Sequence, residues 1–184
     1  MKTKDFLLVA LLPCALLLIP LVGTRTVEGW NWSIGDFTVM WLILAGATYV
    51  YRLLATRPMA NLAYRLGAGL AVVGGFLITW VNLAVQIIGN DNPGNLLYFL
   101  ALLGSLIGVG LARFQPRGLA KVAFALAGVL LLIPVVSVAL WPEDFSPGFA
   151  RVFMLNGVFV LLFTAAGLLF RQAAEGNSGF VTAS

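Results

Sequence analysis

The chain has 184 residues, of which 61% are hydrophobic and only 10% are charged, whereas about a quarter of the residues in a soluble domain are charged. This composition excludes an ordinary water-soluble domain. The formal net charge is +4, but the basic residues stand singly or in pairs at the ends of apolar segments, which argues against a nucleic-acid partner because such a partner needs a dense basic patch.

Six apolar segments occupy nearly the whole sequence. About 20 residues of helix span the roughly 30 Å of bilayer hydrocarbon, and backbone groups in lipid must bond within their own segment, so these segments are expected to be helices. The sequence therefore predicts an all-α, polytopic membrane helix bundle with one domain over residues 1–171 and a flexible, polar cytoplasmic tail over 172–184. The predicted helices lie at 6–22, 37–55, 66–88, 96–112, 119–141 and 149–170.

The first segment follows Lys2 and Lys4 and so has the charge and apolarity of a secretory signal peptide. It lacks a convincing small-x-small cleavage site, and we interpret it as the first membrane helix. The second helix has a clear start signal. Ser33 and Asp36 have the spacing of a capping box, in which a hydroxyl and a carboxylate bond to exposed backbone amides.

The third predicted helix carries a polar face. Its small or polar residues at 75, 79, 82 and 86 stand three or four positions apart, so they share one side of the helix, and that side must face protein rather than lipid. The face serves either as hydrogen-bonding glue between helices or as the wall of a ligand or ion pocket. The candidate pocket residues are Thr79, Asn82, Gln86, Asn156 and Asp91.

The segment between the third and fourth helices predicts a tight turn, with Pro93 and Gly94 at its centre and Asn95 placed to cap the next helix. The turn holds one carboxylate, Asp91, which is too few for a calcium site. A short turn makes the two helices an antiparallel hairpin, and small residues would let them pack closely or accept a second copy of the chain. These packing residues are Gly74, Gly75, Gly104 and Gly108.

The distribution of charge predicts an orientation. With the N-terminus in the cytoplasm, nine basic residues fall on the inner side and two, Arg25 and Arg151, on the outer side, as the positive-inside rule requires. Both termini are therefore predicted to be cytoplasmic. The inner basic residues are Lys2, Lys4, Arg52, Arg57, Arg65, Arg113, Arg117, Lys121 and Arg171.

Three stretches carry a family resemblance. The sequences WVNLAVQIIGNDNPGNLLY at 80–98, ARFQPRG at 112–118 and NWSIGDF at 31–37 resemble a family of small bacterial inner-membrane proteins that has no assigned activity. They cover the middle of the chain, while the first and last helices match only in character. The resemblance implies a bacterial inner-membrane location and supplies no catalytic residues.

Reactive groups are scarce. Histidine is absent, which removes the commonest general base and metal ligand, and one cysteine, Cys14, can form neither an intrachain disulfide nor a multi-cysteine metal site. The sequence predicts no catalytic residue, no metal and no cofactor. The leading hypothesis is a non-enzymatic accessory or scaffold protein that acts through helix packing. Its expected partners are membrane lipids and either a second copy or another membrane protein. The alternative is a small channel, carrier or ligand-binding protein with an outward-facing polar pocket beside the third helix.

Overall fold

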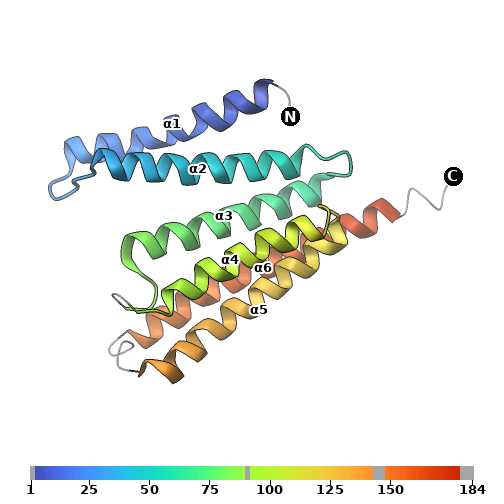
Figure 1. The fold of residues 1–184 in the computed structure, drawn as a ribbon. Coiled ribbons are helices and arrows are strands. Elements are labelled where there is room, and N and C mark those ends of the chain that lie inside the picture. Colours follow the sequence, from blue (N-terminus) through green and yellow to red (C-terminus); the bar gives the residue numbers. More distant parts are fainter. Residues whose placement is uncertain (1–2, 90–91, 143–147, 179–184) are drawn as a thin grey trace. The chain divides into compact units, whose positions relative to one another are not determined.

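The computed structural model describes residues 3–89, 92–142 and 148–178. This part of the chain is all-helical and contains no strand, as predicted. The described residues form six helices, which can be followed along the chain in Figure 1. The helices are α1 (Thr3–Thr26), α2 (Ile34–Ala55), α3 (Leu62–Val85), α4 (Asn95–Leu111), α5 (Pro116–Leu140) and α6 (Phe149–Ser178).

Five of these helices are long and apolar enough to cross a membrane, namely α1, α2, α3, α5 and α6. The remaining helix, α4, is equally apolar but has 17 residues, which corresponds to about 25 Å at the usual rise per residue. The described chain therefore has the helices of a multi-pass membrane protein, and α4 lies at the lower limit of the length that spans a bilayer.

The chain forms two compact units, Met1–Arg57 and Pro58–Ser184, and each is described by itself. In the first unit α1 and α2 pack side by side. The predicted capping box at the start of α2 is confirmed, because the Ser33 hydroxyl accepts from the Asp36 amide and the Asp36 carboxylate accepts from the Ser33 amide. The prediction of a single domain over 1–171 stays a prediction.

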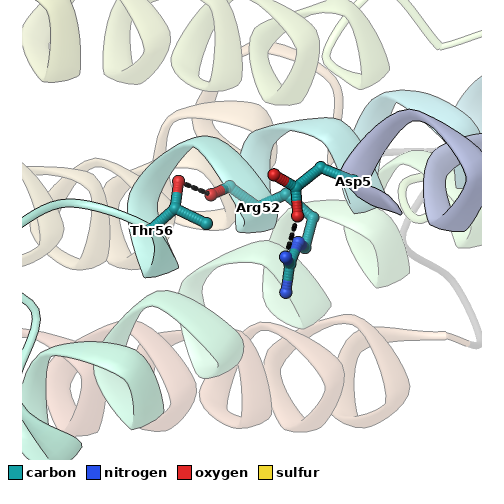
Figure 2. Close-up of polar contacts among 3 residues, drawn as sticks. All are labelled: Asp5, Arg52 and Thr56. Atoms are coloured by element: carbon teal, nitrogen blue, oxygen red, sulfur yellow. Dashed lines mark hydrogen bonds and ion pairs between the residues drawn. The ribbon is translucent and has the colours of Figure 1, made fainter. Parts of the chain in front are cut away.

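An ion pair joins the start of α1 to the end of α2. The Arg52 guanidinium donates to the carboxylate of Asp5, which is 4% exposed, and the Thr56 hydroxyl donates to the Arg52 carbonyl at 2.6 Å (Figure 2). The sequence assigns Arg52 only a topological role at a helix end, and the ion pair adds a structural one. Pairing the two charges inside the hairpin offsets the cost of burying the carboxylate.

In the second unit α6 is the central helix. It packs extensively on α5 and on α3, while α4 packs mainly on α5 and only lightly on α3. The core contains large side chains from all four helices of the unit, including Ile78, Tyr98, Leu130 and Phe159. The main neighbour of α3 is therefore α6, whereas the short loop after α3 favours α4.

The four glycines expected to bring α3 and α4 together have different neighbours. A Cβ on Gly74 would lie 3.0 Å from the Phe163 ring of α6, and one on Gly108 would lie 3.0 Å from Val122 of α5. Gly75 does face α4, where a Cβ would lie 3.7 Å from Leu102, and a Cβ on Gly104 would have nothing within 4 Å among the described residues. The glycines thus serve several interfaces instead of one close α3–α4 contact.

One end of this unit gathers three chain segments. The Tyr64 hydroxyl of α3 donates to the Phe114 carbonyl in the α4–α5 turn at 2.9 Å, and the Asn61 amide donates to the Ala173 carbonyl of α6 at 3.3 Å. Helix α6 continues to Ser178, so the beginning of the predicted tail is helical, and Arg171 pairs there with Glu175 at 3.2 Å. Residues 179–184 of that tail lie outside the described residues.

Candidate functional site

The opposite end of the second unit is shaped by an early end to α3. The sequence predicts this helix to reach residue 88, but it ends at Val85, and Gln86 has a φ of 50°, in the left-handed region. Ile87 and Ile88 follow as buried, non-helical residues. Buried backbone groups that leave a helix need new partners.

Asn95 supplies those partners. Its Oδ1 accepts from the Ile88 amide at 3.0 Å, and its Nδ2 donates to the carbonyls of Ile88, Gly89 and Asn92 at 3.1–3.2 Å. The expectation that Asn95 caps α4 is therefore corrected: Gly94 occupies the N-cap position and Asn95 is the first helical residue. A carboxamide carries the donor and acceptor of a peptide group, so it replaces the helical bonds that Ile88 has lost.

Gly94 brings the turn against α5. The Asn92 Oδ1 accepts from the Gly94 amide at 2.6 Å. A Cβ on Gly94 would lie 2.7 Å from the Ser137 hydroxyl and 2.8 Å from Asn92 Oδ1. A side chain at this position would force both oxygens to shift.

A second polar contact joins α4 to α6. The Tyr98 hydroxyl donates to Asn156 Oδ1 at 3.0 Å, and Asn156 Nδ2 donates to the Tyr98 hydroxyl at 2.8 Å and to the Val152 carbonyl at 2.9 Å. Both side chains are buried. This pair bonds α4 to α6, and Tyr98 belongs to the apolar core.

The register of α3 on α6 indicates that Asn82 lies near the height of Asn156. Earlier on α3, Gly67 faces Ala166 and Phe170 of α6, and Gly74 faces Phe163. Continuing this antiparallel register toward the end of α3 places Asn82 opposite Asn156. The Asn82 Nδ2 donates to the Ile78 carbonyl at 3.0 Å, whereas its Oδ1 is buried without a hydrogen-bond partner among the described residues.

On α5, the residue near the height of Asn156 is Ser137. Gly167 of α6 faces Phe124 of α5, and continuing that register brings Ser137 within about one helical turn of Asn156. The Ser137 hydroxyl is fully buried, and no described atom forms a hydrogen bond with it. Each helix of the second unit thus contributes to this level a polar side chain that is at most 4% exposed. We call Asn82, Tyr98, Ser137 and Asn156 the polar layer.

The polar layer holds two unpartnered oxygens, Asn82 Oδ1 and Ser137 Oγ, within the described part of the chain. Leaving one such group buried and unpaired costs about 1–3 kcal/mol, and buried polar atoms in proteins nearly always have a protein or water partner. All four side chains of the layer are neutral, so its chemistry is hydrogen bonding. Within the described ranges, no group of three or more His, Cys, Asp or Glu residues could hold a metal ion.

The structure divides the five predicted pocket residues. Asn82 and Asn156 are both in the polar layer, while the Thr79 hydroxyl donates to the Gly75 carbonyl of its own helix at 2.9 Å. Gln86 forms the C-cap of α3. Asp91 lies outside the described residues. Sequence reasoning did not assign Tyr98 and Ser137 to the pocket, although each is an isolated polar residue inside an apolar helix.

No family model, curated protein or solved structure matches the chain. The resemblance to small bacterial inner-membrane proteins therefore stays a prediction.

Proposed function

We propose that the chain is a non-enzymatic protein of the bacterial inner membrane, crossing it several times with both termini in the cytoplasm, and that it acts as an accessory or scaffold protein through helix packing. The supporting observation is the use of its polar side chains. In the second unit Asn61, Tyr64, Asn95 and the Tyr98–Asn156 pair bond to other helices or to the connecting turns. These bonds hold the fold together, as a scaffold requires.

The exposed surface supports the same proposal. Large apolar side chains are exposed along the helices, among them Leu100, Leu103 and Leu106 on α4, beside the open Gly104. In a membrane such surfaces contact either lipid or the helices of another protein, and a small residue lets a second helix approach closely.

Native mass spectrometry of the protein released directly from its membrane tests the scaffold proposal. We expect a complex of fixed stoichiometry that contains a second copy or another membrane protein. A chain that leaves the membrane only as a lipid-bound monomer, and that alone moves or converts a solute in proteoliposomes, would contradict it.

A second function, the binding of a small molecule inside the membrane, is favoured by one specific observation. Asn82 Oδ1 and Ser137 Oγ are each buried without a hydrogen-bond partner in the described part of the chain. A purely structural layer would be expected to satisfy both oxygens.

A further inference from the structure

We propose that the seam between α5 and α6 binds a phospholipid with a negatively charged headgroup. The lipid phosphate accepts hydrogen bonds from Arg117, Lys121 and Arg171, and an acyl chain follows the apolar part of the same seam. This site requires only that the second unit lies in a membrane, so it goes beyond the scaffold role and does not depend on it.

Contacts between α5 and α6 set the register of the seam. A Cβ on Gly167 of α6 would lie 2.8 Å from the ring of Phe124 on α5, so these two residues face each other. The start of α5 and the end of α6 lie at the same end of the unit, because the Tyr64 hydroxyl bonds to the Phe114 carbonyl and the Tyr64 ring packs on Phe170 at 5.4 Å. The two helices therefore run antiparallel, as Figure 1 shows.

The basic residues lie one or two helical turns beyond this contact. On α5, Lys121 precedes Phe124 by about one turn. On α6, Arg171 follows Gly167 by about one turn, and the antiparallel register places it near the height of Lys121. Arg117 lies one further turn along, on the same side of α5 as Lys121. All three basic side chains are exposed, so the seam presents three cations near one end.

The charge along the seam favours an anion. Among the described residues of α5 and α6, the one acidic side chain is Glu175, which pairs with Arg171 at 3.2 Å. Both members of this pair are exposed, and such surface pairs contribute little stability, so Arg171 can also bond to a phosphate. Arg117 lies in the first turn of α5, where the helix dipole disfavours a cation. A bound phosphate offsets that repulsion.

The same seam is apolar beyond the basic residues. Phe124 and Leu131 lie two turns apart on one side of α5 and are exposed, and a Cβ on Gly128 between them would have nothing within 4 Å among the described residues. On α6, the exposed residues Leu161 and Leu168 have the same spacing. A headgroup with an acyl chain covers both the basic and the apolar part, whereas a free phosphate would leave the apolar part uncovered.

Exchange of the lipid tests this site. In nanodiscs, replacing phosphatidylcholine with phosphatidylglycerol should raise the melting temperature of the parent protein by roughly 3–6 °C, because a ligand that binds the folded state stabilises it. The double variant Arg117→Gln/Lys121→Gln should lose most of this rise. Native mass spectrometry should find phosphatidylglycerol retained on the parent protein and lost from the variant.

The matched control is the double variant Arg65→Gln/Arg113→Gln. It removes two charges from the same end of the unit, but neither residue belongs to α5 or α6, so it should keep the rise. Equal losses in the two double variants would show only a general attraction between a basic surface and an anionic membrane, and would overturn the site. The absence of any rise in the parent protein would overturn it as well.

Two further measurements test the headgroup and the acyl chain separately. Glu175→Gln removes the carboxylate beside Arg171 and should increase the retention of phosphatidylglycerol, whereas reduced retention would contradict the site. Inorganic phosphate is the soluble probe, and it should leave the melting temperature unchanged because it has no acyl chain. An equal rise with inorganic phosphate would indicate an adventitious ion only, and would contradict the lipid assignment.

Discussion

At the scale of single residues, Asn95 holds the connection between α3 and α4. It makes four hydrogen bonds to the backbone of a segment that has already left the helix. Asn95→Ala should therefore lower the free energy of unfolding by about 2–3 kcal/mol, because buried backbone groups would lose their partners. Denaturant titration in mixed micelles measures the loss.

The control for this variant is Gln115→Ala, because Gln115 is exposed and its side chain makes no capping bond at the start of α5. We expect a change within about 0.5 kcal/mol for the control. Equal effects of the two substitutions would show that Asn95 does not hold the turn.

The Tyr98–Asn156 pair allows a double-mutant cycle. Tyr98→Phe removes the hydroxyl and leaves the buried Asn156 carboxamide short of a partner, which should cost about 1–3 kcal/mol. Adding Asn156→Leu removes the orphaned group, so the double variant should be more stable than the sum of the single losses predicts. Additive losses would mean that the two side chains do not interact.

The spacing of polar residues along the sequence identifies half of the polar layer. It predicts that Asn82 and Asn156 lie at similar depths, because helical periodicity fixes the height of a residue once the helix is located. The role of Asn95 could not be predicted in this way, since it depends on Gln86 leaving the helix, and nothing in the composition of residues 86–88 indicates that change.

At the scale of helices, the glycines differ in what surrounds them. Gly74→Ala should destabilise the second unit by about 1–3 kcal/mol, because the new methyl group would press on the ring of Phe163, which is buried in the core. Gly104→Ala should have no such cost and should gain up to about 1 kcal/mol from helix propensity, because the space beside it is open in the described chain.

Thermal unfolding of the two variants in the same detergent makes the comparison. A Gly104→Ala protein that is as unstable as Gly74→Ala would mean that α4 uses Gly104 for a close contact, either within the chain or with a partner.

The number of helices and their approximate bounds follow from the sequence, but their neighbours do not. Length and apolarity define a membrane helix whatever it packs against. Lipid-facing and core-facing residues are equally apolar in such a chain, so the pattern does not reveal that α3 packs mainly on α6. Loop length alone favours α4 as the neighbour.

At the scale of the whole molecule, the distribution of charge and the number of membrane crossings both bear on which side of the membrane each end of the chain occupies. In the second unit the start of α3, the α4–α5 turn and the end of α6 meet at one end, and that end carries Arg65, Arg113, Arg117 and Arg171. A concentration of basic residues at one end agrees with the positive-inside rule. The short α4 decides whether the chain crosses the membrane an odd or an even number of times.

The position of Ser184 tests this account most directly. A fluorescent protein that matures only in the cytoplasm, fused after Ser184, should fluoresce fully, and an exported phosphatase fused at the same place should be inactive, because six crossings return the chain to its starting side. An active phosphatase and a dark fluorescent protein would place Ser184 outside, which would contradict six crossings that start from a cytoplasmic N-terminus.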